Sequence, residues 1–232
     1  MILRLFSLWP DSWIWTVCMS YIALLLDNVM PERKIAIPGY YFDEIIINWR
    51  GAGSRRRSRV TIRAVMFDWG DTVMRVFPEY SGPMAHWPRV EPIHGVMEAL
   101  ESLRHRYELV LLSNAVDSGA ALVIDALERV GLDRHFHAVF TARDLGSMKP
   151  DPEFFRVALK EIECPPEQAV MVGDDYSADI IGAKKSGMWA VWFNPTEKEK
   201  PSNAELRPDA TIKGFDELDG VVSLLSGRQR LR

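Results

Sequence analysis

From residue 60 to about residue 225, short continuous apolar runs alternate with segments that show the apolar spacing of helices. Continuous apolar runs are typical of strands buried on both faces, and such strands form parallel sheets with helices on either side. The pattern therefore predicts an α/β fold, a three-layer Rossmann-like parallel sheet. The expected elements are strands at Val60–Phe67, Leu109–Leu112, Ala138–Phe140, Ala169–Val172, Trp189–Phe193 and Ala210–Ile212, and helices at Gly95–His105, Ser118–Val130, Pro152–Ile162, Ala178–Ser186 and Phe215–Leu225.

Polar residues stand where the expected strands end. Asp68 follows the first strand, Ser113 follows the second, and Asp174 comes after the fourth. Lys149 lies in a loop just before a helix. Because ligands of such sheets bind beyond the carboxyl ends of the strands, these four residues are predicted to converge on one site.

The residue types at this predicted site suit phosphoryl transfer. Asp68 and Asp174 would repel each other at neighbouring strand ends, and a divalent cation between them removes that repulsion; oxygen ligands at an open site suit Mg²⁺. Ser113 and Asn114 can donate hydrogen bonds to a phosphate, and Lys149 offsets charge on the transferring group. The carboxylate of Asp68 could then attack phosphorus and form an aspartyl-phosphate. A strand-end aspartate taken alone is more often a turn or helix cap, so the prediction depends on the set.

Four motifs, in order, resemble those of the haloacid dehalogenase superfamily of aspartyl-nucleophile hydrolases. The resemblance covers about residues 60–225 and is specific because each motif stands at an expected strand end or loop. The four motifs are Phe67-Asp68-Trp69-Gly70-Asp71-Thr72, Leu111-Leu112-Ser113-Asn114, Met148-Lys149-Pro150-Asp151-Pro152 and Gly173-Asp174-Asp175-Tyr176-Ser177-Ala178-Asp179.

This resemblance implies a role for each matching position. Asp68 is implied to be the nucleophile and, together with the backbone carbonyl of Gly70 and the side chain of Asp174, a Mg²⁺ ligand. Ser113 and Lys149 are implied to hold the phosphate. The branch that it suggests is a phosphatase-like one with a minimal cap.

The resemblance also implies supporting residues and contains one departure. Thr72 would steady the loop after the first strand, and Asp179 would support Lys149 and the water shell of the metal. Family phosphatases usually carry a second aspartate two residues after the nucleophile, which protonates the leaving group. That position is Gly70 here, and Asp71 follows one place later. Either Asp71 reaches the leaving group, or the acid is missing and the enzyme is slow or prefers good leaving groups, since such an acid contributes ~10²–10⁴-fold.

The insertion after the first motif, about Val73–Glu91, is short and predicts an open site. In this family open sites often admit large substrates or borrow a partner subunit as a lid, so an oligomer is compatible with the sequence. The side chains that could touch a leaving group are Arg75, Tyr80, His86, Trp87 and Arg89.

Residues 1–59 form an N-terminal extension with a different composition, and Arg55–Arg59 marks the boundary. Its apolar stretch, Ser12–Leu26, is shorter than the ~20 residues of a membrane-spanning helix. Three readings stay open: an accessory helix, a weak membrane-associating segment, or translated sequence upstream of the true start. The domain is expected at 60–225, and 226–232 is a basic C-terminal tail.

Composition narrows the remaining function classes. A net charge of −4 argues against a dedicated nucleic-acid binder, and two cysteines fit a reducing cytoplasm. We therefore expect a cytoplasmic, Mg²⁺-dependent hydrolase of small or larger phosphate monoesters. Two alternatives remain: a catalytically weak module that keeps the fold for binding, which Gly70 mildly favours, and a phosphatase attached to a membrane by Ser12–Leu26.

Overall fold

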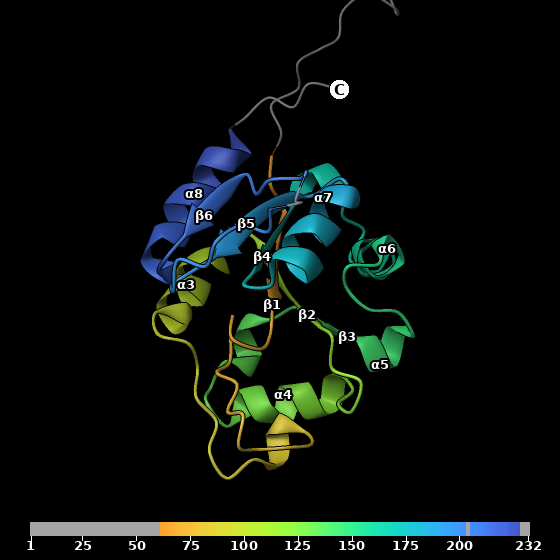
Figure 1. Ribbon diagram of the computed structural model, residues 1–232, viewed down its shortest axis with the longest axis vertical. Coiled ribbons are helices and arrows are strands. Elements are labelled where there is room, and N and C mark those ends of the chain that lie inside the picture. Colours follow the sequence, from red (N-terminus) through yellow and green to blue (C-terminus); the bar gives the residue numbers. More distant parts are fainter. Residues whose placement is uncertain (1–60, 203–204, 228–232) are drawn as a thin grey trace, which may run out of the picture. The chain divides into compact units, whose positions relative to one another are not determined.

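A six-stranded parallel sheet forms the centre of the domain (Figure 1). The computed structural model describes residues 61–202 and 205–227. The strands lie in the spatial order β3-β2-β1-β4-β5-β6, and every neighbouring pair is parallel. Their bounds are β1 Ala64–Asp68, β2 Glu108–Ser113, β3 Ala138–Thr141, β4 Ala169–Gly173, β5 Trp189–Phe193 and β6 Ala210–Ile212. The predicted α/β class and parallel sheet are confirmed.

Helices cover both faces of this sheet and give it three layers. One face carries α3, α4 and α8, and the other carries α6, η4 and α7, as the two separate core clusters show. The helices are η1 Met84–His86, α3 Val96–Leu103, α4 Ala120–Glu128, η2 Asp133–His135, α5 Ala142–Leu145, α6 Pro152–Glu161, η3 Pro166–Gln168, η4 Tyr176–Ile181, α7 Gly182–Lys185, η5 Phe215–Glu217 and α8 Leu218–Ser226.

Successive strand residues point to opposite faces, which is why the core falls into two clusters. In β1, Val65 and Phe67 pack under α3, α4 and α8, whereas Ala64 and Met66 pack under α6 and α7. All four side chains are fully buried. Burial on both faces explains why this strand reads as a continuous apolar run.

The fourth motif folds differently from the helix predicted at Ala178–Ser186. The helix begins at Tyr176, its first six residues form a π-helix, and α7 continues it. The carboxylate of Asp175 caps this turn by accepting hydrogen bonds from the N–H groups of Ser177 and Ala178, at 2.8 and 2.9 Å. Short π segments are frequent at functional sites, and here the segment carries Asp179. Apolar spacing could not reveal it, because six residues are too few to show a period.

The connection between β1 and α3 contains one short 3₁₀ turn, η1, and two isolated β-bridges. We call residues 73–95 the cap segment. Arg129, at the end of α4, donates to the carbonyls of Ala85 and Trp87 in this segment, at 2.9 and 2.6 Å. The same side chain reaches the carbonyl of Pro88 at 3.4 Å. These contacts fix the short cap segment against α4 without a domain of its own.

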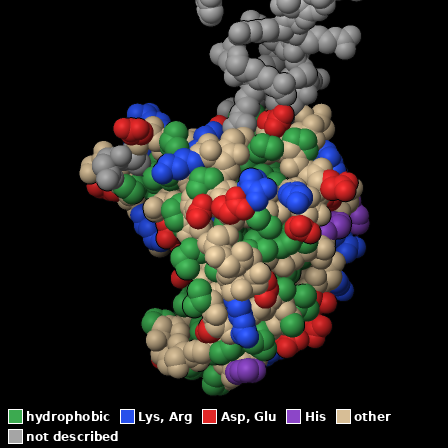
Figure 2. Space-filling view, turned by 90° about the vertical axis from the view of Figure 1, so that its right-hand side faces the viewer, with side chains coloured by type: hydrophobic (Ala, Val, Ile, Leu, Met, Phe, Trp, Pro, Cys, Tyr) green, Lys and Arg blue, Asp and Glu red, His purple; other side chains and the backbone are tan. Residues whose placement is uncertain are grey.

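The predicted extension at residues 1–59 and the tail from residue 228 lie outside the described residues. α8 ends at Ser226, next to the expected domain end. Within the described ranges, no helix combines the length and the apolar character needed to cross a bilayer. On the face shown in Figure 2, acidic and basic side chains are interspersed with hydrophobic ones.

Candidate active site

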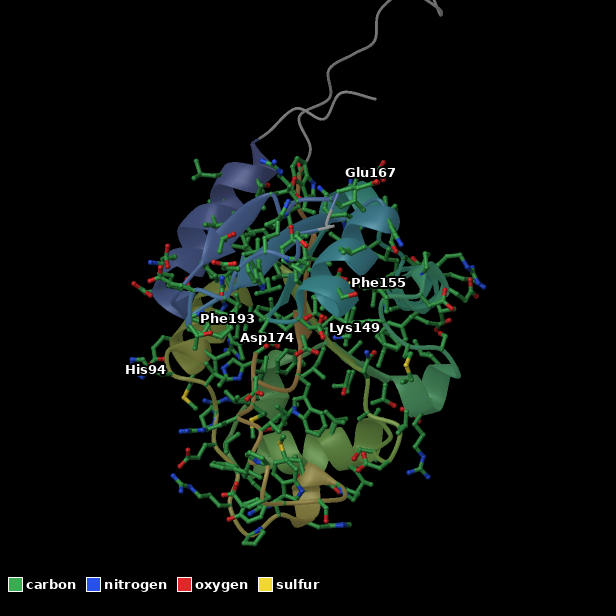
Figure 3. All side chains as sticks on the ribbon, in the orientation of Figure 1. His94, Lys149, Phe155, Glu167, Asp174 and Phe193 are labelled. Atoms are coloured by element: carbon green, nitrogen blue, oxygen red, sulfur yellow. The ribbon has the colours of Figure 1, made fainter. Side chains whose placement is uncertain are left out.

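The polar strand ends meet in one cleft at the carboxyl edge of the sheet. Asp68 is the last residue of β1, Ser113 is the last of the neighbouring β2, and Asp174 follows β4 on the other side. These three residues and Lys149 all line a cleft of about 380 Å³. Figure 3 shows Lys149 and Asp174 at this edge of the central strands. The predicted convergence of the four residues is present in the structure.

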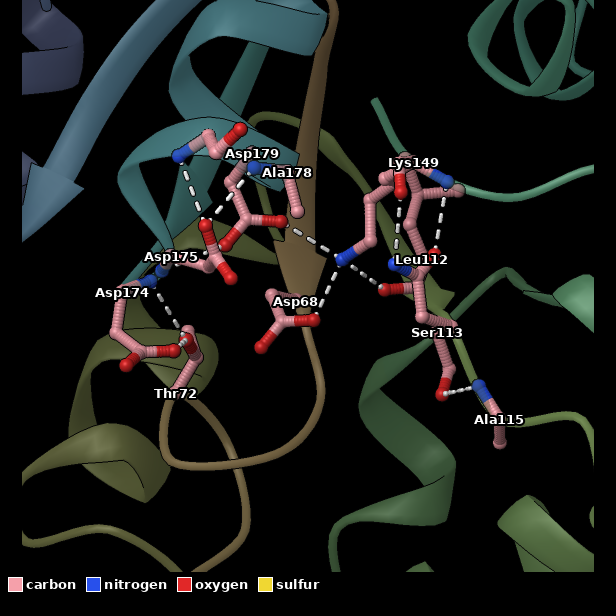
Figure 4. Close-up of polar contacts among 12 residues, drawn as sticks. Asp68, Thr72, Leu112, Ser113, Ala115, Lys149, Asp174, Asp175, Ala178 and Asp179 are labelled. Carbon is pink, nitrogen blue, oxygen red and sulfur yellow. Dashed lines mark hydrogen bonds and ion pairs between the residues drawn. The ribbon is translucent and has the colours of Figure 1, made fainter. Parts of the chain in front are cut away.

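Lys149 is the centre of the polar network in Figure 4. Its ammonium donates to Oδ1 of Asp68 at 2.5 Å, to Oδ1 of Asp179 at 2.8 Å and to the carbonyl of Leu112 at 3.0 Å. The Lys149 side chain is 1% exposed and that of Asp179 is 0% exposed. Because an ammonium has three donors, all of its hydrogen-bonding capacity is used. The network therefore fixes the charge of Lys149 beside one carboxylate oxygen of Asp68.

The charge states of this network follow from burial and from its neighbours. Burial by itself lowers the pKa of Lys149, but the negative charges of Asp179 and Asp68 outweigh burial and hold that pKa above its ordinary value. Burial raises the pKa of Asp179, and the ammonium of Lys149 opposes this shift. Lys149 is therefore a fixed cation at neutral pH.

Gly173 makes room for Asp179. A Cβ added at Gly173 would lie 2.2 Å from Oδ2 of Asp179, which is closer than atoms can approach. The same Oδ2 accepts a hydrogen bond from the N–H of Asp175 at 3.0 Å. Thus glycine at the end of β4 is a packing requirement of the network, which the sequence motif alone does not explain.

Asp174 is positioned by three different elements. Its backbone N–H donates to Oγ1 of Thr72 at 3.1 Å, and that hydroxyl lies 3.4 Å from Oδ1 of Asp174. The indole of Trp192 donates to its carbonyl at 3.0 Å, and the ammonium of Lys198 donates to its Oδ2 at 3.1 Å. Burial raises the pKa of Asp174, and the hydrogen bond from Lys198 opposes that effect. Thr72, which was predicted to steady the loop after β1, thus connects this loop to the end of β4.

Three carboxylates at the floor of the cleft could hold a cation. Single oxygens of Asp68, Asp174 and Asp179 lie within 4.8 Å of one another. Asp179 already uses Oδ1 for Lys149 and Oδ2 for the N–H of Asp175. Oδ2 of Asp68, in contrast, has no hydrogen-bond partner in the described part of the chain. Asp68 and Asp174, with Gly70 also lining the cleft, therefore form an oxygen donor set of the kind that Mg²⁺ prefers.

Asn114 holds the loop of Lys149. Its Nδ2 donates to the carbonyl of Lys149 at 2.9 Å, and its Oδ1 accepts from the N–H of Lys149 at 2.8 Å. The hydroxyl of Ser113 accepts from the N–H of Ala115 at 3.1 Å, which leaves its own proton for another acceptor. Ser113 therefore has the donor expected of a phosphate-binding residue, whereas both polar atoms of Asn114 bind main chain.

Asp71 is not among the residues that line the cleft. Its backbone has a φ of 54°, and its Oδ1 accepts from the N–H of Val76 at 2.9 Å. Asp71 lines a second cavity of about 500 Å³ together with Arg75 and His94, and this cavity adjoins the cleft because Asp174 lines both. A Cβ added at Gly70 would lie 3.0 Å from Cγ2 of Val76, so the loop also leaves little room at the usual acid position.

The sequence missed several residues that line the cleft. Trp87 does so as expected for a cap residue, but Arg75, Tyr80, His86 and Arg89 do not. Asp117, in the loop after β2, lines the cleft without having been predicted. Lys198 was also missed; it lies in a Lys/Glu-rich loop with no apolar period and no motif that could signal contact with Asp174.

The parallel sheet carries a cluster of carboxylates at its carboxyl edge and a buried lysine among them, an arrangement that suits an α/β hydrolase. A family model described as haloacid dehalogenase-like hydrolase matches residues 53–193. The chain belongs to this family.

Two curated relatives agree with this membership, and a solved structure shares the fold. The phosphoserine phosphatase of Thermus thermophilus is 35% identical over 129 residues, which are 55% of this chain and 50% of that protein. The ribulose-1,5-bisphosphate 5-phosphatase of Halopiger xanaduensis is 31% identical over 147 residues, 60% of this chain and 62% of that protein. The magnesium-bound crystal structure of the HAD-hydrolase YfnB from Bacillus subtilis has a TM-score of 0.59, with 18% identity over 70% of this chain and 99% of that one. The chain spans between half and two thirds of the length of the two curated relatives.

Proposed function

We propose that this protein is a Mg²⁺-dependent hydrolase of phosphate monoesters that uses Asp68 as its nucleophile. The observation that carries the proposal is the buried ammonium of Lys149, bonded to Asp68 at 2.5 Å in a cleft that Asp174 also lines. A fixed positive charge beside a carboxylate suits attack on a dianionic phosphate, because it offsets the repulsion between two anions. The two curated relatives are named phosphatases, which supports the reaction class.

In the proposed reaction a carboxylate oxygen of Asp68 forms a bond to phosphorus. The bond between phosphorus and the ester oxygen breaks, and its electron pair leaves with that oxygen. Ser113 donates a hydrogen bond to a phosphate oxygen, and Lys149 holds Asp68 in place. Water then attacks phosphorus, which releases inorganic phosphate and restores the carboxylate.

Mg²⁺ held by Asp68, Asp174 and the carbonyl of Gly70 would supply further positive charge to the phosphate. The magnesium in the Bacillus subtilis structure supports the choice of ion. Thr72, Asn114 and Asp179 hold Asp174 and Lys149 in position, and Asn114 and Asp179 also line the cleft.

We propose further that Asp71 shapes the turn and is not the general acid. Its carboxylate accepts a hydrogen bond from the N–H of Val76 and lines a second cavity, which adjoins the cleft at Asp174 but is not lined by Asp68. With Gly70 at the usual acid position, the leaving oxygen takes its proton from solvent. This arrangement predicts rates that fall steeply as the leaving group becomes more basic.

The test is hydrolysis of p-nitrophenyl phosphate by the purified full chain, with and without Mg²⁺. Asp68→Asn should abolish the Mg²⁺-dependent turnover. Asp71→Asn keeps an acceptor at a left-handed position that asparagine tolerates, and it should change kcat by less than about tenfold, whereas loss of a general acid would lower kcat by ~10²–10⁴-fold. Activity that survives Asp68→Asn would contradict the proposed nucleophile, and absence of turnover in the wild type would favour the binding-module alternative.

The expectations about binding partners and about the location of the protein in the cell remain predictions. A phosphorylated substrate, a lid supplied by a second subunit and a cytoplasmic location all agree with the open cleft and the two cysteines. Membrane attachment through Ser12–Leu26 concerns residues outside the described ranges.

A further inference from the structure

We propose that the cleft selects phosphate monoesters whose leaving group carries an organic cation, and that Asp117 recognises this charge. The inference rests on the proposed function, because it concerns the leaving-group side of the same cleft. It adds a substrate class: esters of amino alcohols are favoured over esters of the same size that carry a second anion.

The formal charge of the cleft lining is the first argument. The lining residues include five aspartates and one lysine, Lys149, which leaves a formal charge of −4. Lys198, bonded to Asp174, and Arg143, whose guanidinium donates to the carbonyl of Asp117, lie outside the lining and reduce this charge to −2. The five aspartates are Asp68, Asp117, Asp174, Asp175 and Asp179. A divalent cation would balance this remainder, but the phosphate dianion of a substrate makes the occupied cleft negative again. A second anion on the leaving group is therefore repelled, and a cation is attracted.

Among the five aspartates of the cleft lining, Asp117 is the one with no role in the reaction centre or in capping a helix. Asp68, Asp174 and Asp179 form the reaction centre, and Asp175 caps η4. Asp117 is exposed and accepts one hydrogen bond, at its Oδ1, from the hydroxyl of the adjacent Ser118 at 2.9 Å. Its Oδ2 has no partner within the described ranges, so this oxygen can accept from a ligand.

The loop that carries Asp117 is held by its main chain. Arg143 of α5 donates its guanidinium to the carbonyl of Asp117 at 3.0 Å, and its N–H to the carbonyl of Ala115 at 3.1 Å. The guanidinium makes no ion pair with the carboxylate of Asp117 among the described contacts. Asp117 therefore lines the cleft from a main chain that is held in place, a condition for selective recognition.

The cap side of the cleft brings no compensating cation. The lining residues from the cap segment are Val76, Gly82, Met84 and Trp87, all without charge. The guanidinium groups of Arg75 and Arg89 both lie over the ring of Phe77 and pair with Glu91. A cleft lined by an indole, aliphatic groups and a carboxylate suits an ammonium group, because aromatic rings attract cations.

The experiment compares two-carbon phosphate esters of opposite charge. The wild-type full chain is assayed for kcat/KM with 2-aminoethyl phosphate and with phosphoglycolate, and p-nitrophenyl phosphate serves as the neutral reference. We expect the wild type to prefer the amine. Asp117→Asn should lower the amine-to-acid ratio roughly fivefold, because the variant loses one exposed attraction to the amine and one repulsion of the acid. High salt should lower the wild-type ratio through screening.

Asp125→Asn is the matched control, since Asp125 lies on α4, is exposed and is not among the lining residues. It should leave the ratio unchanged. Turnover of p-nitrophenyl phosphate without preference for the amine, or an equal ratio in wild type and Asp117→Asn, would overturn the charge selection while the proposed function stands. Absence of turnover with all three esters would overturn the proposed function and this inference with it. A melting curve for Asp117→Asn confirms that the variant is folded.

Discussion

Replacement of Lys149 with methionine should destabilise the domain as well as inactivate it. Lys149→Met removes the ammonium but keeps an unbranched side chain of similar length. In the wild type this ammonium is buried with three acceptors, two of which are carboxylates. The variant leaves the fully buried carboxylate of Asp179 without its counter-charge.

The size of the effect follows from that burial. Removing one partner of a buried ion pair costs about 3–5 kcal/mol, because the remaining charge stays desolvated. For a domain of this size, with about 2–4 °C per kcal/mol, the melting temperature should fall by roughly 6–20 °C.

The loss should also depend on pH. Burial raises the pKa of Asp179, and removal of Lys149 takes away the group that opposes this shift. An acid whose pKa is higher in the folded than in the unfolded protein favours the folded state as pH falls, because the folded protein binds the proton first. The deficit of Lys149→Met relative to the wild type should therefore shrink as pH falls from about 8 toward about 5.

Urea unfolding followed by circular dichroism measures both effects on the full chain. Lys160→Met, on the exposed side of α6, is the matched control and should stay within about 0.5 kcal/mol of the wild type. In an Asp179→Asn background, Lys149→Met should be less destabilising by about 0.5–3 kcal/mol. A loss below about 1 kcal/mol, or a loss that does not change with pH, would refute the claim that Lys149 and Asp179 form a buried ion pair.

Two further predictions concern residues that the sequence did not single out. Lys198 donates to Asp174 from a side chain that is 57% exposed, so Lys198→Ala should lower the Mg²⁺ concentration for half-maximal activity by about two- to fivefold. The control Lys185→Ala should leave that concentration unchanged. A higher Mg²⁺ requirement in Lys198→Ala would contradict competition between this ammonium and the metal. Arg129 donates to three carbonyls of the cap segment, so Arg129→Ala should raise KM and lower the free energy of unfolding in urea by about 1–2 kcal/mol. The control Arg134→Ala should change neither quantity. An unchanged KM in Arg129→Ala would show that the position of the cap segment does not depend on Arg129.

Much of the fold could be predicted because its signals are local. Burial of β1 on both faces requires apolar residues at consecutive positions, and that requirement is visible in the sequence. The start of α6 was predicted from Asp151 and Pro152, and the carboxylate of Asp151 caps this helix by accepting a hydrogen bond from the N–H of Glu153. The helix α5 was missed, because its four residues are too few to show a period.

The site was less accessible to prediction than the fold. The position of Asp68 at a strand end was predictable, but the direction of the Asp71 side chain was not. That direction depends on a single positive φ and on one hydrogen bond to Val76. Asn114 was predicted to bind substrate and lines the cleft, but the sequence did not reveal that its amide also binds the main chain of Lys149, which is 35 residues away.

The sequence by itself determined the parallel sheet and the edge at which Asp68, Ser113 and Asp174 lie, because strand direction and apolar burial are properties of short segments. Only the tertiary structure decided which groups meet: the ammonium of Lys149 between two carboxylates, Lys198 on Asp174, and Asp117 in the lining of the cleft. The physical reason is that hydrogen bonds act over about 3 Å, so contacts between distant segments depend on how whole elements pack and not on residue type.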